Sequence, residues 1–245
     1  MLTGWMARGL APGAVTVIDP HIADEWQDKG LRLNATPPTD PAVLVVAVKP
    51  QMMSKVLGKM PRLSDTLVVS VAAGTTLATF QQAFPDAPIV RVMPNTPAAI
   101  GQGISALIGN ARASEADMAL ALGLMRAVGR VVRLDSEDQM DAVTALSGSG
   151  PAYVFHMIEA MAAAGEAEGL PPTLALELAR ATVAGAGALA MDADEDPAIL
   201  RRNVTSPGGT TAAGLEQLMD ADRGLPPLMR RTIAAAAARG RELGA

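Results

Sequence analysis

Short apolar runs alternate with helix-like segments through the first half of this chain. The clearest runs are residues 42–48, 66–72 and 88–93, and each is followed within two residues by Gly or Pro. Continuous apolar runs of this length are typical of strands that are buried on both faces of a parallel sheet. Because helix-like segments fall between them, the alternation predicts an α/β fold with a parallel sheet.

The strand pattern stops after Leu134, and the rest of the chain is helix-like. We therefore expect two domains, an α/β domain over residues 1–135 and an all-helical domain over residues 136–245. In the first we expect further strands at residues 14–18, 31–34, 104–108 and 129–134, and helices at residues 22–30, 52–63, 75–84 and 114–128. In the second we expect helices at residues 137–146, 151–168, 173–191, 197–204, 210–221 and 226–243.

Composition excludes several classes of function. The chain has no cysteine and only two histidines, which excludes disulfides, zinc fingers and iron–sulfur clusters. No metal ligand is predicted, although a site made of carboxylates alone stays open. Aromatic residues make up 2% of the chain and the net charge is −5, which argues against a nucleic-acid partner.

The chain shows no sign of a membrane or secretory segment. Its longest apolar run, residues 42–48, is far shorter than the ~20 residues that cross a bilayer. The first residues lack a signal-peptide pattern. We therefore expect a cytoplasmic protein without a membrane partner. The helical half is rich in small residues, which predicts closely packed helices and a dimer interface.

The ends of four predicted strands carry residues suited to a cofactor crevice. Ligands of open parallel sheets bind beyond the carboxyl ends of the strands. The four segments are residues 19–20, 47–50, 72–74 and 93–97, and the last contains Asn95. Asp19 is suited to accept hydrogen bonds from a ribose diol, which favours NAD over NADP, but a helix cap is an equally good interpretation. Each segment alone is also explained as an ordinary loop.

Two glycine-rich segments of the helical half are further candidates. Residues 203–211 (NVTSPGGTT) combine two glycines with four hydroxyl side chains before a predicted helix. Backbone N–H groups there can bind a carboxylate or phosphate, and a capped turn is the alternative. Residues 147–151 (SGSGP) either approach a ligand or only connect two helices. We expect His156 to be a buried core residue rather than a catalyst.

Together these motifs resemble the pyrroline-5-carboxylate reductase family. The matching segments are AVKPQ (47–51), SVAAGTT (70–76), RVMPNTPAAIGQG (91–103), ALSGSGPAYVF (145–155) and NVTSPGGTTAAGL (203–215). The resemblance implies a Rossmann-like domain that binds a nicotinamide cofactor, followed by a helical dimerisation domain, assembled as homodimers or rings of dimers. The implied reaction is the reduction of 1-pyrroline-5-carboxylate to L-proline with NADPH or NADH as hydride donor, the last step of proline biosynthesis.

The resemblance also implies roles for individual residues. The cofactor would lie against Ala47, Val48, Lys49, Pro50, Val71, Ala72 and Ala73, with Asn34 at the adenosine ribose or its phosphate. Ser206, Gly209 and Thr210 would bind the substrate carboxylate, and Asn203 would help to place substrate and nicotinamide. Thr211 would hydrogen-bond the ring nitrogen and act as proton donor or relay. The imine can bind already protonated, so positioning and hydride transfer are the main catalytic tasks.

One element of the family is missing from the first residues. The family begins with a strand and a Gly-x-Gly-x-x-Gly-type loop, whereas residues 1–10 look like the end of the helix that follows them. The missing strand belongs in the middle of the sheet, so two strands should lack a ladder partner, and the cofactor pyrophosphate should lose its glycine-loop amides. A chain that starts at Met1 should therefore bind a dinucleotide poorly. We expect in-frame codons upstream of Met1 to encode this strand and loop. The alternative is a true truncation, in which the fold is repaired in another way.

Other functions fit parts of the pattern. The β-hydroxyacid dehydrogenases share the two-domain plan but need a lysine on the long helix after the sheet domain, and this chain has no lysine after Lys59. An imine reductase for another cyclic imine would keep the cofactor crevice and change the carboxylate site. A truncated, non-catalytic paralogue that dimerises through its helical half is the remaining alternative.

Overall fold

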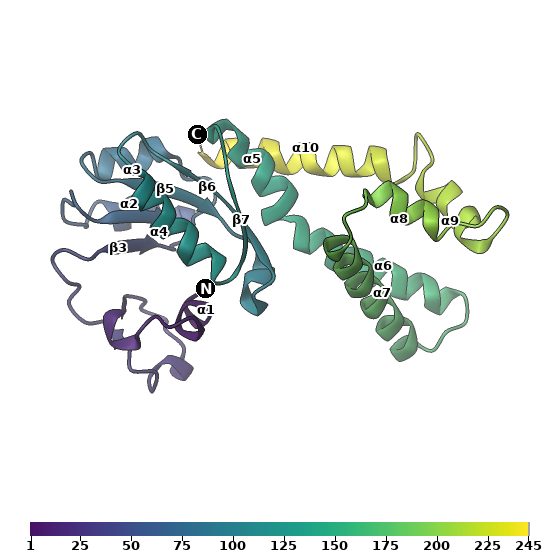
Figure 1. The fold of residues 1–245 in the computed structure, drawn as a ribbon, viewed down its shortest axis with the longest axis horizontal. Helices are drawn as coiled ribbons and strands as arrows, with labels where there is room; N and C mark the ends of the chain where they lie inside the picture. The colour runs from purple at the N-terminus through teal and green to yellow at the C-terminus, as the bar shows by residue number, and fades with distance from the viewer. Residues whose placement is uncertain (245) are drawn as a thin grey trace. The chain divides into compact units, whose positions relative to one another are not determined.

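The computed structural model describes residues 1–244, which divide into two compact units. Met1–Gly148 and the residues from Ala237 on form the first, which holds every strand, and Ser149–Ala236 form the second, which is helical (Figure 1). The division differs from the boundary expected at residue 135. The reason is that residues 136–148 pack into the first unit, where Met140 and Ala145 are buried.

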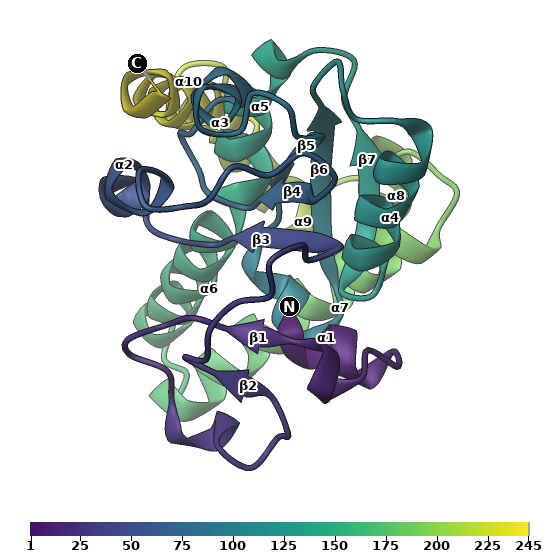
Figure 2. The same cartoon turned by 90° about the vertical axis from the view of Figure 1, so that its left-hand side faces the viewer.

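A five-stranded sheet forms the centre of the first unit (Figure 2). Its strands follow chain order: β3 (Val43–Val46), β4 (Leu67–Ser70), β5 (Ile89–Met93), β6 (Gly103–Gly109) and β7 (Gly129–Arg133). The neighbours are parallel except β5 and β6, so the prediction of a wholly parallel sheet is wrong for this pair. Residues 94–102, which contain the 3-10 segment Thr96–Ile100, separate these two strands. A parallel crossover needs about a dozen residues or more, so the chain turns back instead.

Helices cover both faces of this sheet and form two apolar clusters. On one face, Phe80 of α3 (Leu77–Ala83) and Leu57 of α2 (Met53–Leu57) pack with Val68 and Ile89. On the other, α4 (Glu115–Arg126) packs Met118 and Met125 against the alternate strand residues, such as Val69, Val90 and Leu107. Since side chains alternate along a strand, the apolar runs supply both clusters, as their patterns predict.

The two first strands form a separate sheet. β1 (Thr16–Val17) pairs in parallel with β2 (Arg32–Leu33), and within residues 1–244 no ladder joins β1 to β3. The expected interruption of the sheet is therefore confirmed. The helix predicted at residues 22–30 is wrong, because only the 3-10 turn Asp24–Trp26 forms there. This segment is mostly exposed, and a short helix without a packed face is not stable in water. The short helix α1 (Leu2–Ala7) precedes β1.

The helices of the second unit lie at their predicted positions. They are α6 (Gly150–Ala167), α7 (Pro172–Asp192), α8 (Pro197–Asn203), α9 (Thr210–Leu218) and α10 (Leu225–Gly244), whose last turns belong to the first unit. α6 and α7 pack closely: a Cβ added at Gly165 would lie 3.4 Å from the Cβ of Ala175. The short helix α5 (Met140–Val143) and the π-helix Thr144–Gly148 lead into α6.

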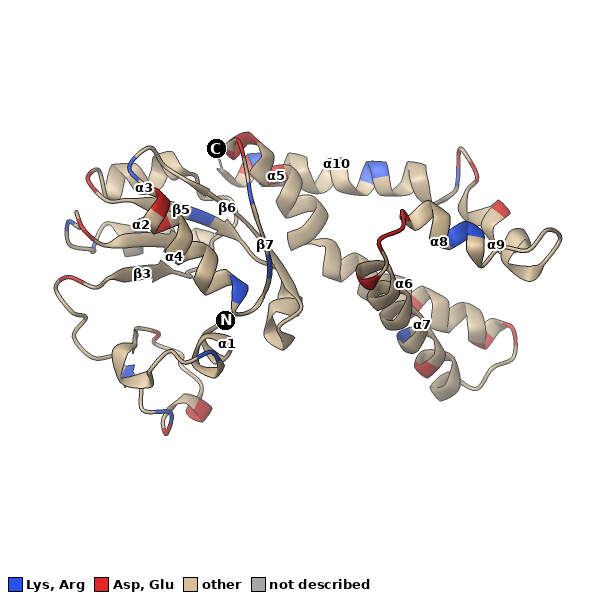
Figure 3. Cartoon of the chain, viewed as in Figure 1, with Lys and Arg blue, Asp and Glu red and all other residues tan. Residues whose placement is uncertain are grey.

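Apolar side chains remain exposed along α6 and α7. Phe155 is 57% exposed, Leu178 48% and Leu189 57%, and Figure 3 shows few charged residues on either helix. By length and composition alone α7 is apolar enough to cross a membrane, and 11% of the window that qualifies is buried. Glu177 and Arg180 interrupt the apolar sequence of α7, so it contains no long uninterrupted apolar run.

Candidate functional site

Three predicted cofactor segments meet at one edge of the larger sheet. The parallel strands β3, β4 and β5 carry them at their carboxyl ends: Ala47, Val48, Lys49 and Pro50 after β3, Val71, Ala72 and Ala73 after β4, and Asn95 after β5. The segment after β4 is tightly held, because the buried hydroxyl of Ser70 accepts the Ala72 N–H at 3.3 Å. Small side chains there leave the backbone open to close approach by a flat or extended ligand.

Asn95 connects this edge to the segment SGSGP. Its Oδ1 accepts the Ile104 N–H at 2.9 Å, and its Nδ2 donates to the Ser147 hydroxyl at 3.5 Å. Gly148 lies directly on β5, because an added Cβ would collide with the Met93 side chain. Ser147 and Gly148 therefore lie beside the end of β5. The π-helix that contains Ser147 is of a type often found at functional sites.

Asp19 and Asn34 lie at the ends of the separate β1–β2 pair and bind each other. The Asn34 side chain accepts the Asp19 N–H and donates to the Asp19 carbonyl, both at 3.0 Å. Asp19 Oδ1 accepts the His21 N–H at 2.8 Å and so closes a turn. It is not a helix cap, because the next helical segment begins at Asp24 with Ala23 as its N-cap. Asn34 has a left-handed backbone with φ 49°, a conformation that Asn tolerates better than most residues. Both residues thus hold the end of this sheet in shape.

A cavity of about 300 Å³ opens near these strand ends. It is lined by Ile18, Pro37, Met52, Lys55, Val56, Lys59, Met60 and Pro61. Apolar side chains make up most of its wall, and two ammonium groups add positive charge. Such a pocket can hold an apolar ring system that carries a negatively charged substituent.

In the second unit, the turn between α8 and α9 gathers the predicted anion-binding residues. Asn203 ends α8, Gly209 is the N-cap of α9, and Thr210 and Thr211 form its first turn. Gly208 has φ 70° and Gly209 lies so close to the Ser206 hydroxyl that a Cβ would collide with it. Three hydroxyl residues of this turn are exposed: Ser206, Thr210 and Thr211. The first N–H groups of a helix have no partner within it, so this turn presents backbone and hydroxyl donors together.

Positive charge lies next to this turn. A shallow depression of about 510 Å³ beside it is lined by Arg201, Arg202, Thr205, Ala212, Leu215, Glu216 and Met219. The Thr205 hydroxyl donates to the Arg201 carbonyl at 2.6 Å, so this hydroxyl serves the turn itself. Two guanidinium groups and the N-terminus of α9 favour an anion here.

His156 is the site residue that sequence analysis placed wrongly. Its side chain is 82% exposed, and Nδ1 lies 3.0 Å from Glu159 Oε2. The apolar surroundings in the sequence indicated a core, but α6 exposes its apolar side chains. Among residues 1–244 no group of three His, Cys, Asp or Glu side chains is placed to hold a metal ion.

The ion pair between the buried Arg91 and the partly buried Glu137 was not predicted from the sequence. Arg91 Nη1 lies 2.7 Å from Glu137 Oε1, and the Arg91 side chain is 5% exposed. The available signal was a single arginine inside the apolar strand IVRVM. An ionised group in such a strand needs a partner, although its position along the chain cannot be predicted from the pattern.

Known proteins match nearly the whole chain. A sequence model described as pyrroline-5-carboxylate reductase dimerisation matches residues 137–243. The pyrroline-5-carboxylate reductase of Synechocystis sp. is 41% identical over 241 residues, which are 96% of this chain and 89% of the relative. That of Pseudomonas aeruginosa is 40% identical over 252 residues, 99% of this chain and 92% of the relative.

Solved structures of pyrroline-5-carboxylate reductases are also similar to this chain over nearly its whole length. The pyrroline carboxylate reductase of Plasmodium falciparum with NADP bound superposes with a TM-score of 0.85 and 26% identity, covering 99% of this chain and 92% of that one. The pyrroline-5-carboxylate reductase of Coxiella burnetii gives a TM-score of 0.84 and 32% identity, covering 100% and 93%.

We predict that the Asn34 side chain stabilises the β1–β2 pair through Asp19. Asn34→Gly removes both hydrogen bonds but keeps the left-handed backbone, so amide exchange at Asp19 should accelerate about fivefold. Asn34→Ala adds backbone strain of about 1 kcal/mol and should exchange faster still. Hydrogen exchange measured by mass spectrometry or NMR reads this out. Unchanged exchange at Asp19 in Asn34→Gly would contradict the prediction.

Proposed function

The chain belongs to the pyrroline-5-carboxylate reductase family, and we propose how its residues carry out the reaction of that family. The reaction reduces the C=N bond of 1-pyrroline-5-carboxylate to give L-proline. Bound NADPH or NADH supplies the hydride that adds to the imine carbon. The protein has to hold the cofactor, hold the substrate carboxylate and let the ring nitrogen keep or gain a proton. The single observation that carries this function is the near-full-length match at about 40% identity.

We propose that the cofactor binds at the carboxyl edge of β3, β4 and β5. Ala47, Val48, Lys49 and Pro50 line one side, and Val71, Ala72, Ala73 and Asn95 the other. The small and partly buried residues after β4 support this placement, because a larger side chain would keep a dinucleotide away from the backbone.

The adenosine end is assigned to the cavity of about 300 Å³ near Asn34 and Asp19. Its apolar wall suits a purine, and Lys55 and Lys59 suit a phosphate. The Asp19 carboxylate remains a candidate for a ribose hydroxyl, with one oxygen already bound to the His21 N–H. We propose that the two lysines favour NADPH over NADH.

The substrate carboxylate is assigned to the turn before α9. The Ser206 and Thr210 hydroxyls and the Gly209 backbone would bind it, with Asn203 placing the ring against the nicotinamide. Free N–H groups of α9 and the neighbouring Arg201 and Arg202 support an anion at this position. The Thr211 hydroxyl would hydrogen-bond the ring nitrogen: its oxygen accepts from the N–H of a protonated imine, and its O–H donates to the nitrogen of an unprotonated one. A threonine hydroxyl is a weak acid. It need not supply the proton, because the imine can already carry it when it binds.

We further propose that an additional strand with a glycine-rich loop joins the sheet between β1 and β3. Figures 1 and 2 place the β1–β2 pair on the β3 side of the larger sheet, and no ladder connects β1 with β3 within residues 1–244. A strand in this position would pair with both, and its loop would supply amides for the pyrophosphate.

The chain carries the dimerisation domain of its family, and we propose a homodimer, or a ring of dimers, as the working form. The exposed apolar residues of α6 and α7 support a subunit interface there, which also accounts for the apolar length of α7 without a membrane. The acidic net charge of −5 supports the absence of a nucleic-acid partner. We propose a cytoplasmic location, where this biosynthetic reaction meets reduced nicotinamide cofactors.

The purified chain should oxidise NADPH, and NADH less efficiently, when 1-pyrroline-5-carboxylate is added. Absorbance at the nicotinamide band measures turnover, and L-proline is identified by mass spectrometry. A second sample, extended before Met1 by a strand and a glycine-rich loop, should show higher cofactor affinity. If neither protein turns over while both fold as dimers, the chain is a non-catalytic member of its family. Turnover of another cyclic imine alone would indicate a different imine reductase.

Variants of the turn before α9 should weaken substrate binding selectively. Ser206→Ala and Thr210→Val should each raise the KM for pyrroline-5-carboxylate about tenfold or more, because each removes a hydrogen bond to a charged group. Cofactor affinity should not change. Thr205→Val is the matched control, since its hydroxyl serves the Arg201 carbonyl, and its KM should stay near that of the unaltered chain.

An equal rise of KM in Thr205→Val would assign these effects to the fold of the turn instead. Thr211→Val should mainly lower kcat, and Thr211→Ser should restore most of it. An unchanged kcat in Thr211→Val would exclude a role of this hydroxyl in proton placement.

If α6 and α7 form the subunit interface, a single charged side chain introduced there should destabilise the dimer. Leu178→Glu should shift the protein toward the monomer in analytical ultracentrifugation, because a carboxylate would be buried without a partner. The neighbouring exposed change Glu177→Gln should leave the dimer intact. Flotation with phosphatidylcholine vesicles should recover no protein. A monomeric unaltered chain, or one that floats with vesicles, would contradict the assignment.

A further inference from the structure

Arg91 lies in the middle of the sheet, where a charged side chain is unfavourable unless other groups compensate for its burial. It belongs to β5, between β4 and the antiparallel β6, opposite Ser70 on one side and Ile108 on the other. Its side chain is 5% exposed. Burial of a guanidinium is costly unless an opposite charge and hydrogen bonds compensate for it.

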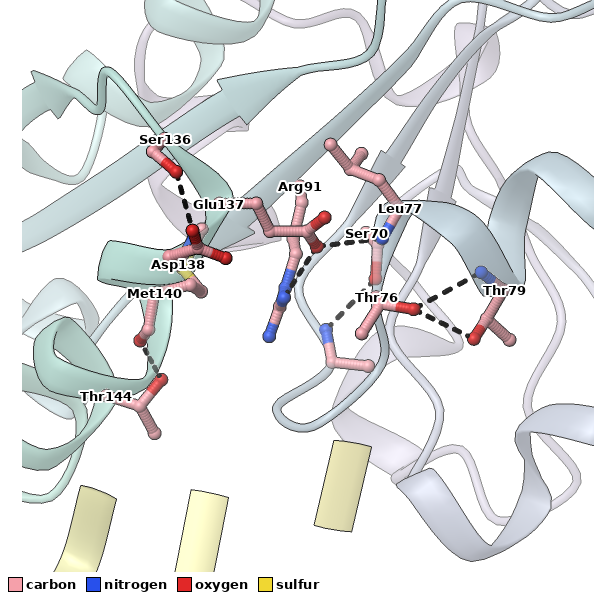
Figure 4. Close-up of polar contacts among 11 residues, drawn as sticks. Ser70, Thr76, Leu77, Thr79, Arg91, Ser136, Glu137, Asp138, Met140 and Thr144 are labelled. Carbon is pink, nitrogen blue, oxygen red and sulfur yellow. Dashed lines mark hydrogen bonds and ion pairs between the residues drawn. The ribbon is translucent and has the colours of Figure 1, made fainter. Parts of the chain in front are cut away.

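The compensation comes from Glu137, in the segment that leaves the sheet. A single oxygen of this carboxylate, Oε1, accepts from Arg91 Nη1 at 2.7 Å and from the backbone N–H of Leu77 at 2.8 Å (Figure 4). Leu77 is the first residue of α3 and directly follows its N-cap, Thr76. Glu137 therefore fixes the point at which the segment after β4 enters its helix.

The same segment is held at two other points. At its start, the Ser70 hydroxyl accepts the Ala72 N–H. In its middle, Gly74 has φ 72°, and an added Cβ would lie 3.1 Å from the Cβ of Leu243, so the last turn of α10 rests on it. Residues 71–76, which we call the β4–α3 loop, are thus fixed at the start, the middle and the end.

We propose that Arg91 and Glu137 are positioning residues of the reductase, which hold the β4–α3 loop in the shape that receives the nicotinamide cofactor. Neither residue needs to touch the cofactor. Glu137 acts through the Leu77 N–H, and Arg91 acts by holding the Glu137 carboxylate. The inference rests on the proposed cofactor site, because Val71, Ala72 and Ala73 belong to this loop.

The test measures NADPH affinity of the folded protein, by fluorescence titration, together with amide exchange of residues 71–77 without cofactor. Glu137→Ala should raise the Kd for NADPH about tenfold and speed exchange in the loop, because a charge-assisted hydrogen bond to Leu77 is lost. Glu137→Gln keeps an acceptor oxygen and should restore much of the affinity. Arg91→Met should weaken NADPH binding as well, and Arg91→Lys should do so less.

Two controls separate positioning from stability. Met118→Ala removes a buried side chain from the cluster on the other face of the sheet, so it should lower the unfolding midpoint and leave the Kd unchanged. Glu115→Gln breaks the exposed pair with Arg133, whose hydrogen bond and charge hold the pKa of Glu115 below its usual value. This variant should change neither quantity appreciably.

Ala73→Leu tests the cofactor site itself, because it enlarges a side chain within the loop. A raised Kd in Ala73→Leu, Glu137→Ala and Arg91→Met, with unchanged controls, supports the inference. If only Ala73→Leu raises the Kd and Glu137→Ala merely lowers the unfolding midpoint, the pair is structural and the inference is overturned. If none of the three changes the Kd, the proposed cofactor site is wrong and the inference falls with it.

Discussion

The backbone ladder that joins β3, β4 and β5 is the constraint on which the proposed cofactor site depends. It aligns Val46 with Ser70 and Ser70 with Arg91, so three parallel strands end at the same edge. The loops that follow these strands therefore begin side by side at that edge. In the loop after β4 the side chains are small, so the backbone is the surface offered to a ligand. A dinucleotide that lies along such an edge is recognised mainly by shape and main-chain groups, which is why apolar strands and short loops suffice.

Two glycines allow close contacts beside these loops, within the first unit. Gly148 lies against Met93 at the end of β5. Leu243 lies against Gly74 in the loop after β4. Glycine at both contacts allows a backbone approach that any larger residue would prevent.

Local patterns predicted the elements of this fold but not their long-range partners. Apolar runs located every strand of the larger sheet, and Ser114 was recognised as the N-cap of α4, where it forms a capping box with Asp117. The antiparallel direction of β6 was missed because side-chain alternation is the same in both directions. His156 was misplaced because an apolar helix face reads the same whether the core or a partner subunit covers it. The cofactor and substrate segments were found from motifs and from resemblance, and their roles remain predictions.

The Arg91–Glu137 pair illustrates why some site geometry lies beyond sequence patterns. Its members are 46 positions apart, and the Leu77 N–H that they hold is 60 positions from Glu137. A buried ion pair is often no more stabilising than an apolar pair of similar volume, so stability alone does not account for it. An apolar pair, however, has no acceptor for the Leu77 N–H. It also does not fix the direction in which the Leu77 N–H points. The carboxylate does both, which makes the pair a source of geometric precision at the loop where we propose that the cofactor binds.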